Sequence, residues 1–296
     1  MPQQRAVIIY NPMSGRAGRR AEDARRMTEL LAARGIAAEA CATAGPDDAT
    51  RLAREAVDGG VKLIVSYGGD GTLNEVIQGL AESRAALAVW PGGTSNVVAR
   101  DLAMPFAMER IADVIAAGKT TRIALGLARG GDASRYFVMM AGIGLDASIA
   151  RGVNKRLKRR VGELAYWVTG IKHLFTWPAE RFTITVDGQC FESTFAIVGK
   201  GKGYGGGMTI TPNARLEEPL FEVYILPPQK SNLAYLRALS ACMRGKPELT
   251  GATMIKGCRV EANSSHAPWV EADGEIIGPL PMTFEVVPEA LTIIVP

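Results

Sequence analysis

Cysteine and histidine are scarce in this chain of 296 residues, which holds four cysteines and two histidines. The cysteines stand far apart and form no CxxC pair: Cys41, Cys190, Cys242 and Cys258. We therefore expect neither a zinc site nor a disulfide framework. Scattered cysteines without a framework favour a reducing, cytoplasmic environment.

Long hydrophobic runs and a strong charge imbalance are also missing. No stretch of about eighteen uncharged apolar residues occurs, so no transmembrane helix is expected. The opening "MPQQRAVIIYNP" lacks the charged start and long apolar core of a signal peptide. The net charge of +4 is too small to imply nucleic acid, and we expect no nucleic-acid partner. A hydrophobic content of 47% is ample for a packed core.

The first part of the chain alternates short apolar strands with helical segments. Strands are predicted at 5–10, 61–67 and 85–91, and helices at 19–35, 73–82, 95–104 and 107–119. This alternation favours a parallel sheet covered on both faces. The pattern ends near Thr120.

The second part consists mainly of short strands separated by turn residues, which indicates an antiparallel sandwich or barrel. The sequence "VDGQ" (186–189) predicts a hairpin turn. Two helical segments, 147–177 and 230–244, interrupt the strands. We therefore predict an α/β lobe over 1–122 and an all-β sandwich or barrel with helical insertions over 123–288.

Glycines surround Asp70 in "YGGDGT" (67–72), directly after a predicted strand. Backbone N–H groups freed by glycine, with a helix N-terminus behind them, form a cradle for anions. An acid at its centre makes sense if Asp70 binds Mg²⁺ on the phosphates of a ligand. Alternatively, Asp70 turns inward and accepts backbone N–H groups. Thr72 is predicted to cap the following helix.

Two further strand ends carry small and hydroxyl-bearing residues, in "NPMSG" (11–15) and "PGGTSN" (91–96). In open α/β sheets, ligands bind at the carboxyl ends of the strands. Together with the loop around Asp70, these segments predict one polyanionic ligand, a nucleoside triphosphate. Each segment alone is also compatible with an ordinary turn between a strand and a helix.

Several glycine-containing segments in the second part stay ambiguous. The sequence "EADGE" (271–275) contains Asp-Gly, the commonest hairpin turn. The clusters "GIGLDA" (142–147) and "GYGGGMTITPNA" (203–214) are equally compatible with turns and with ligand contacts.

A basic segment, "RGVNKRLKRR" (151–160), holds six Lys or Arg residues and precedes an amphipathic stretch. One helical face of that stretch gathers Leu164, Trp167, Val168, Ile171, Leu174 and Phe175. This combination is typical of a segment that lies in a membrane interface. The alternative is a helix packed on the core beside a solvated run of charge.

The motifs, taken in order, resemble the diacylglycerol kinase catalytic-domain family, specifically its soluble bacterial lipid kinases related to sphingosine kinases. The resemblance covers nearly the whole chain. It rests on "NPMSG", "GGDGTLNEV", "PGGTSNVVARDL", "GIGLDA", "YGGGMTITPNA" and "VEADGEIIGPLPMTFEVVPEALTIIVP". Together these motifs are specific for the family, but they do not identify the lipid.

The resemblance implies an ATP-dependent lipid kinase that transfers the γ-phosphate to the hydroxyl of diacylglycerol or a related lipid. The first lobe would resemble phosphofructokinases and NAD kinases, and the second lobe would be a β-sandwich. The active site would lie in the cleft between the lobes. The terminal segment 289–296 would return to the first lobe. The protein would be cytoplasmic, act in phospholipid metabolism and bind an anionic membrane peripherally through 151–177. A homodimer stays open.

The resemblance also assigns roles to single residues. Asp273 of "DGE" would be the general base, and a catalytic Mg²⁺ would accompany ATP. The residues expected to contact ATP are Asn11, Ser14, Thr43, Gly68, Gly69, Asp70, Gly71, Thr72, Thr94 and Glu275.

A second, structural Mg²⁺ is implied for the loop "PNARLEEPL" (212–220), where the family reads "PxAxxxDG". Here Glu218 replaces the aspartate and Pro219 the glycine. The ligands would be main-chain oxygens of Arg215 and Leu220 and the side chain of Glu218.

Two other functions are considered. A kinase of a soluble substrate, such as an NAD kinase, shares the GGDG sequence, but the "LNEV" after the loop and the late "DGE" favour a lipid kinase. An inactive lipid-binding protein is disfavoured by the intact GGDGT and DGE sequences. Diacylglycerol, a sphingoid base, ceramide and an undecaprenol-like alcohol all stay open as substrates.

Overall fold

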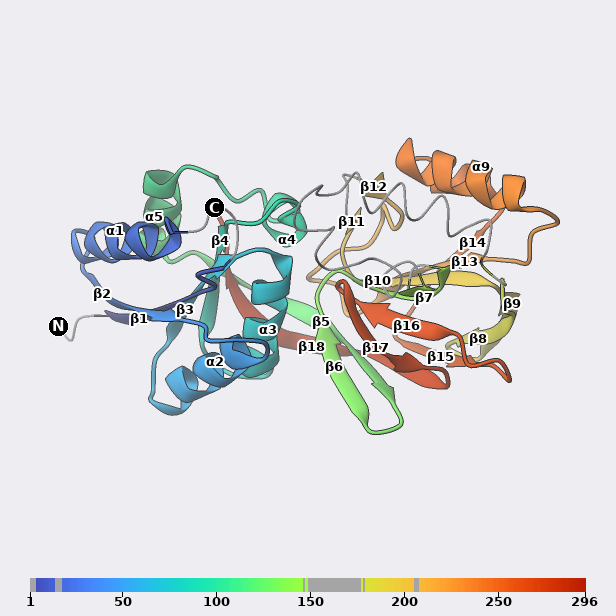
Figure 1. The fold of residues 1–296 in the computed structure, drawn as a ribbon, viewed down its shortest axis with the longest axis horizontal. Helices are drawn as coiled ribbons and strands as arrows, with labels where there is room; N and C mark the ends of the chain where they lie inside the picture. The colour runs from blue at the N-terminus through green and yellow to red at the C-terminus, as the bar shows by residue number, and fades with distance from the viewer. Residues whose placement is uncertain (1–3, 14–17, 146, 149–176, 178, 205–207) are drawn as a thin grey trace. The chain divides into compact units, whose positions relative to one another are not determined.

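The computed structural model describes residues 4–13, 18–145, 147–148, 177, 179–204 and 208–296 (Figure 1). These residues form two compact units, each described by itself below. Unit 1 comprises Met1–Leu125 and Pro288–Pro296, and unit 2 comprises Gly126–Val287. None of the helices in this described part is long and apolar enough to span a membrane.

Unit 1 is built on a parallel sheet with the strand order β2-β1-β3-β4. Its strands are β1 (Gln4–Tyr10), β2 (Ile36–Ala42), β3 (Leu63–Gly68) and β4 (Ala86–Pro91). At the end of the long strand β18 (Met282–Ile294), Thr292 and Ile293 pair in parallel with the start of β4. Because all these strands run the same way, their carboxyl ends meet at one edge of the sheet.

Helices cover both faces of this sheet. In Figure 1, α1 (Arg20–Ala32) and α5 (Met108–Ala117) lie on one face, and α2 (Asp48–Asp58) and α3 (Asp70–Leu80) lie on the other. The short helix α4 (Val97–Asp101) follows β4. The predicted α/β fold of this part is thus confirmed.

The sequence analysis did not predict β2 and α2. The strand reads "IAAEACA" and has only one buried residue, Ile36. As an edge strand exposed along much of its length, it lacks the apolar run by which β1, β3 and β4 were found.

Unit 2 contains a six-stranded antiparallel sheet with the order β14-β13-β10-β7-β16-β17. Its strands are β7 (Met140–Gly144), β10 (Phe195–Gly199), β13 (Phe221–Leu226), β14 (Thr253–Gly257), β16 (Trp269–Ala272) and β17 (Glu275–Pro279). A second antiparallel array contains β5 (Thr120–Gly130), β6 (Ala133–Phe137), β8 (Phe182–Val186), β9 (Gln189–Ser193), β15 (Arg259–Asn263) and the first half of β18.

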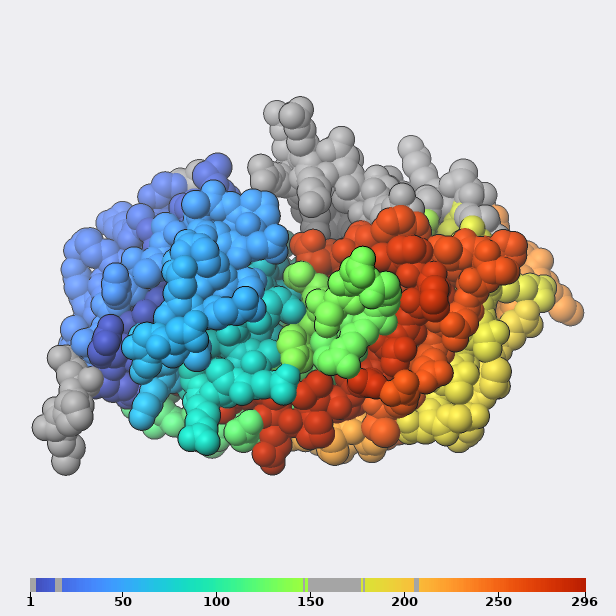
Figure 2. Space-filling model, turned by 90° about the horizontal axis from the view of Figure 1, so that it is seen from below, coloured from blue at the N-terminus to red at the C-terminus, as the bar shows by residue number. Residues whose placement is uncertain are grey.

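The core of unit 2 lies between these two arrays, as in a β-sandwich. Buried side chains of the six-stranded sheet, such as Ile143 and Val223, share one cluster with Ile184 and Phe284 from the second array. The hairpin of β5 and β6 (green in Figure 2) lies beside the red strands, and β6 contacts β16 and β17. The predicted sandwich is confirmed.

The remaining elements of unit 2 connect these strands. They are the two-residue strands β11 (Gly203–Tyr204) and β12 (Met208–Thr209), the helix α9 (Asn232–Met243) and the 3₁₀ turn η2 (Pro247–Thr250). Helix α9 confirms the helix predicted for 230–244. The helix predicted for 147–177 lies almost entirely outside the described residues.

Two turns of unit 2 bear on the sequence predictions. The hairpin predicted at "VDGQ" joins β8 and β9, with φ of 44° at Asp187 and 87° at Gly188. By contrast, the continuous apolar stretch 134–144 does not form one strand but contributes to two, β6 and β7. The break at Val138 and Met139 occurs because their N–H groups bind a side chain, that of Asp273.

Candidate functional site

Four of the predicted ligand-contacting segments come together at the carboxyl edge of the unit 1 sheet. Thr43, just past β2, donates its backbone N–H to the carbonyl of Tyr10 at 2.9 Å, next to Asn11. In the same way, the Gly92 N–H after β4 donates to the carbonyl of Gly68 at 2.8 Å. The ends of β1 and β2 are thus adjacent, as are the ends of β3 and β4.

The predicted residues of this edge differ in exposure. Thr94 and Gly71 are exposed, whereas Thr43, Gly68 and Thr72 are buried. Asn11, Gly69 and Asp70 lie between these extremes, and Ser14 lies outside the described residues. A ligand at the edge therefore reaches Thr94 and Gly71 most readily, while the buried residues shape the backbone beneath it.

The glycines allow the loops after β3 and β4 to touch through their backbones. A Cβ atom on Gly93 would lie 2.5 Å from the Cα of Gly69, closer than such atoms come in proteins. A Cβ on Gly68 would lie 2.7 Å from the Cβ of Thr72. Gly93 is therefore required by close backbone packing, and Gly68 by the close approach of the Thr72 side chain.

Helix α3 begins inside the glycine-rich segment, at Asp70, three residues earlier than predicted. Gly69 is the N-cap residue, and no side chain caps the helix. The prediction that Thr72 caps α3 was wrong, because Thr72 already lies within the helix and packs its side chain on Gly68.

Asn96 fixes the loop after β4. Its side-chain oxygen accepts the N–H of Gly93 at 2.8 Å, and its side-chain nitrogen donates to the Gly93 carbonyl at 2.9 Å. Its backbone adopts the left-handed conformation, with φ of 45°, that asparagine tolerates better than most residues. The side chain thereby closes the turn that leads into α4.

Asp70 turns toward this same loop. Its Oδ1 accepts the backbone N–H of Val97, at the start of α4, at 2.8 Å. Burial raises the pKa of the Asp70 carboxyl, while the N–H groups of Val97, Asn96 and Val98 act in the opposite direction. Of the two roles considered for Asp70, the structure contains the inward one: the carboxylate ties the loop after β3 to the loop after β4.

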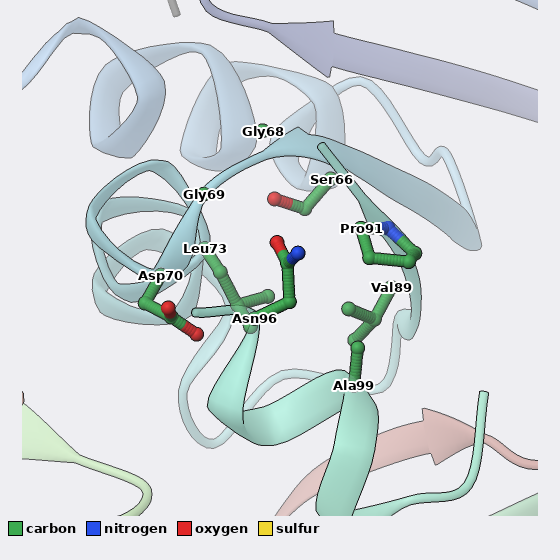
Figure 3. A pocket seen from close by; sticks show the side chains of 9 residues that line it. All are labelled: Ser66, Gly68, Gly69, Asp70, Leu73, Val89, Pro91, Asn96 and Ala99. Carbon is green, nitrogen blue, oxygen red and sulfur yellow. The ribbon is translucent and has the colours of Figure 1, made fainter. Parts of the chain in front are cut away.

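A small pocket opens between these two loops (Figure 3). Its lining combines two glycines, three polar residues and four apolar residues, all labelled in Figure 3: Gly68, Gly69, Ser66, Asp70, Asn96, Leu73, Val89, Pro91 and Ala99. The hydroxyl oxygen of Ser66 is buried and has no hydrogen-bond partner in the described structure. A buried hydroxyl of this kind can bind a water or a ligand atom that enters the pocket.

The sequence analysis missed a cluster around Arg20 that supports the same edge. The buried Arg20 guanidinium donates to the carbonyl of Gly92 and lies 4.4 Å from the ring centroid of Tyr67. The Tyr67 ring stacks on Trp90 at 3.5 Å, and its hydroxyl donates to Asp23 at 2.5 Å. Burial, reinforced by Asp23, raises the pKa of Tyr67 to about 12. In the sequence, Arg20 belongs to the run "GRRAED" (18–23) at the start of α1, and such a charged run usually lies in solvent.

Asp273, in unit 2, is held by the backbone on the neighbouring strand. Its carboxylate accepts the N–H groups of Val138 at 2.7 Å and of Met139 and Met140 at 3.0 Å each. It lies in the turn between β16 and β17 with φ of 48°. These bonds fix the orientation of the carboxylate, whereas its role as a general base stays a prediction.

The neighbours of Asp273 in the "EADGE" turn differ from each other. Glu271 is buried, and its Oε2 accepts the N–H of Gly274 at 2.6 Å, which braces the turn. Sequence reasoning gave Glu271 no role. Glu275 is exposed at the start of β17, and its predicted contact with ATP stays a prediction.

The loop expected to hold a structural Mg²⁺ does not offer a free set of ligands. The Arg215 carbonyl accepts the ammonium of Lys200, and the Glu218 carboxylate pairs with Lys256 at 2.7 Å. The assignment of Arg215, Glu218 and Leu220 to a metal site stays a prediction, and amino groups bind two of its three oxygen donors in this structure. Nor do the described residues contain any group of three or more His, Cys, Asp or Glu side chains placed to hold a metal ion.

The fold and the edge define a class of protein, because glycine-rich loops at the carboxyl ends of parallel strands are typical of nucleotide-binding enzymes. Comparisons with known proteins narrow this class. Residues 5–128 match the diacylglycerol kinase catalytic domain, and residues 139–295 match the YegS C-terminal NAD kinase beta sandwich-like domain. The chain belongs to the diacylglycerol kinase family.

Individual relatives match the sequence of this chain over nearly its full length. The chain is 34% identical to a diacylglycerol kinase of Bacillus subtilis, covering 95% of this chain and 93% of the relative. It is 31% identical to a diacylglycerol kinase of Staphylococcus carnosus, with coverage of 95% and 92%. A crystal structure of a diacylglycerol kinase from Bacillus anthracis aligns with a TM-score of 0.80 at 24% identity, covering 100% and 98% of the two chains, and supports the fold.

Proposed function

We propose that this protein transfers the γ-phosphate of ATP to the hydroxyl of diacylglycerol or a related lipid. The observation that carries the proposal is the backbone contact between the loops after β3 and β4, at Gly69 and Gly93. This contact forms a glycine-rich surface at the carboxyl edge of the sheet, beside the exposed Thr94. Membership of the diacylglycerol kinase family supports both the reaction and the class of acceptor.

The residues of unit 1 fit a nucleotide polyphosphate. The glycines let phosphate oxygens approach the backbone closely, and the positive end of α3 points to the same edge. The Thr94 hydroxyl can donate a hydrogen bond to a phosphate oxygen. When bound, ATP with Mg²⁺ supplies the phosphoryl group and neutralises its charge.

A catalytic Mg²⁺ fits this edge if it takes most of its ligands from the nucleotide. Mg²⁺ usually keeps several waters and binds through one or two carboxylates together with substrate phosphates. Among the described residues of the edge, Asp70 is the carboxylate that lines the pocket. We assign Asp70 first to tying the loops together and second, as a proposal, to a water-mediated contact with the metal.

Asp273 is proposed to accept the proton of the lipid hydroxyl as it attacks the γ-phosphate. The three N–H groups that bind its carboxylate hold it in one orientation. Phosphoryl transfer depends mainly on positioning and on charge neutralisation. A well-placed base typically adds a factor of about 10²–10⁴.

Access to a lipid requires a surface that meets the membrane. The basic segment 151–160 and the aromatic face after it lie outside the described residues, so their membrane role stays a proposal from the sequence. Within the described residues, α9 offers a second candidate. Its exposed residues include Leu233 and Met243, each 53% exposed, together with Arg237 and Arg244. Apolar tips among cations suit the headgroup region of an anionic membrane.

Helix α9 is anchored by its opposite face. Tyr235 and Cys242 are buried, and the Tyr235 hydroxyl forms a 2.8 Å hydrogen bond with that of Thr194. The Ser231 side chain caps the helix by accepting the Ala234 N–H. A helix fixed in this way can present its outer side chains to a bilayer without unfolding.

The proposed reaction is tested by offering two acceptors at once. Purified protein receives γ-labelled ATP and Mg²⁺ with NAD and with diacylglycerol in mixed micelles. The proposal predicts label in the lipid and none in NAD. Label in NAD would favour the soluble-substrate kinase, and ATP binding without transfer to any added lipid would favour the inactive lipid-binding protein.

A further inference from the structure

The loop between β12 and β13 (residues 210–220) is partly buried and held by hydrogen bonds within unit 2. Thr211, Ala214 and Leu216 of this loop are buried. The Thr211 hydroxyl donates to the carbonyl of Gly201 at 2.8 Å. At the start of β13, the buried carboxylate of Glu222 accepts both the backbone N–H of Asn213, at 2.7 Å, and its side-chain N–H, at 2.9 Å. The first part of the loop is thus held by hydrogen bonds that Thr211 and Asn213 donate to the Gly201 carbonyl and the Glu222 carboxylate.

Lys200, which directly follows β10, binds the centre of the loop. This lysine is 0% exposed, and its ammonium donates to the carbonyl of Arg215. The same carbonyl accepts the N–H of Glu218 at 3.3 Å. A fully buried lysine is rare because removing its charge from water costs several kcal/mol unless it is paired. The hydrogen bond to the Arg215 carbonyl therefore compensates in part for the burial of the Lys200 ammonium.

The end of the loop is bound by a second lysine, from β14. The ammonium of Lys256 lies 2.7 Å from Oε2 of Glu218, and the Arg215 guanidinium lies 3.5 Å from its Oε1. Lys256 lowers the pKa of the Glu218 carboxyl, and Arg215 and Lys200 add to this effect. Glu218 thus already has cationic partners at both of its oxygens.

A divalent cation fits this loop poorly. Mg²⁺ requires oxygen ligands in a near-ideal octahedron, but the Arg215 carbonyl and the Glu218 carboxylate both bind amino groups. A metal ion that approached them would also meet the repulsion of three positive side chains. The longer side chain of Glu218, where relatives carry aspartate, reaches Lys256 on the neighbouring strand.

We propose that Lys200 and Lys256, here called the lysine clasp, hold the 210–220 loop in place of a divalent metal ion. Unit 2 then folds and keeps its structure without Mg²⁺. Any metal requirement of the protein then arises outside this loop. This inference concerns the stability of unit 2 and does not depend on the proposed function.

The test compares thermal unfolding of the full-length protein, without nucleotide, in excess EDTA and in excess Mg²⁺ at matched ionic strength. We expect the same Tm in both conditions. We expect a lower Tm for Lys256→Gln in both, and a larger loss for Lys200→Met, which leaves the Arg215 carbonyl without its ammonium. Lys246→Gln, which changes an exposed lysine far along the chain from the loop, is the matched control and should leave Tm unchanged.

The variants also locate any effect of the metal. A rise in Tm with Mg²⁺ that disappears in Glu218→Gln would place a metal at the loop and overturn the proposal. A rise that persists in Glu218→Gln arises at another site and agrees with the lysine clasp. If Lys200→Met does not fold, Lys256→Gln and Glu218→Gln still decide between the two results.

Discussion

Two candidate aspartates, Asp70 in unit 1 and Asp273 in unit 2, each accept backbone N–H groups from another segment of their own unit. The sequence shows each as an acid beside glycine, and from that pattern alone both appear equally suited to metal or proton chemistry. The partners distinguish them. Asp70 accepts the N–H of Val97 at the start of a short helix that follows a neighbouring strand, whereas Asp273 accepts the N–H groups of Val138, Met139 and Met140, between and at the start of two strands of the sandwich. Such contacts depend on folding and cannot be read from the sequence.

Asp273→Asn should lower turnover by at least about 10²-fold, because the amide cannot take the proton of the lipid hydroxyl. It should also lower Tm, since the amide N–H₂ would face one of the three N–H donors. Steady-state kinetics and thermal unfolding measure the two effects separately.

The control for this variant is Glu271→Gln, which weakens the same turn at its Gly274 contact. A loss of Tm with a much smaller loss of turnover in Glu271→Gln would assign the kinetic effect of Asp273→Asn to chemistry. Near wild-type turnover in Asp273→Asn would remove Asp273 from the role of base.

Asp70→Asn should change how stability depends on pH. Because burial raises the pKa of Asp70 above its ordinary value of 3.8, the folded protein binds this proton more tightly than the unfolded chain. The free energy of unfolding therefore falls as pH rises from about 3.8 through the raised pKa, and it stays lower at neutral pH.

Asparagine at position 70 keeps an oxygen for the Val97 N–H but removes this charge. We expect Tm at neutral pH to equal or exceed that of the wild type, with the difference vanishing in acid. Unfolding curves over a pH series measure this difference in Tm. A variant that is less stable than the wild type only at pH values above the raised pKa of Asp70 would contradict the burial argument.

At the scale of elements, the loops after β3 and β4 illustrate what the sequence can reveal. Strand-to-helix turns rich in glycine were recognisable, and so was their common edge, because parallel strands share one. The sequence did not reveal the direct contact of Gly69 with Gly93 or the hydrogen bond from Arg20 to the Gly92 carbonyl. Glycines that give phosphate access and glycines that pack against each other look the same in a sequence.

Gly93→Ala and Gly71→Ala form a matched pair for these loops. The added Cβ at position 93 would lie 2.5 Å from the Cα of Gly69, whereas at position 71 it would meet open space. Gly93→Ala should force the loops apart and lower both Tm and affinity for ATP. Gly71→Ala, within α3, should raise stability by about 0.5–1 kcal/mol. Equal Tm values for the two variants would contradict the packing described here.

We predict that helix α9 contributes to binding of anionic membranes. Changing Arg237 and Arg244 to Glu together should weaken sedimentation with anionic vesicles, because each cation near such a surface contributes about 1 kcal/mol. Activity on vesicles should fall, and activity on a short-chain lipid dissolved as monomers should stay near normal. Changing Arg54 and Lys62, two exposed residues of unit 1, to Glu together makes the same change of net charge and is the control. Vesicle binding that drops equally in the control would show that α9 has no special part.

At the scale of the whole molecule, the sequence was sufficient for the fold class. Apolar runs separated by helical patterns identified the α/β unit, and turn residues at regular spacing identified the sandwich. The strand β2 was not predicted because it lies at the edge of the sheet and consists mostly of partly exposed alanines instead of large buried apolar residues. The metal loop could not be judged because Lys200 and Lys256 lie outside "PNARLEEPL" in sequence and reach it only in the folded unit.

The transfer of label from γ-labelled ATP into lipid tests the central claim most directly. Wild type, Gly93→Ala and Asp273→Asn, each shown to be folded, are incubated with diacylglycerol and with a total lipid extract, and label is partitioned between organic and aqueous phases. The account predicts a labelled lipid phosphomonoester with the wild type and its loss in both variants. Label that stays in the aqueous phase with the wild type, or labelled lipid undiminished in both variants, would contradict it.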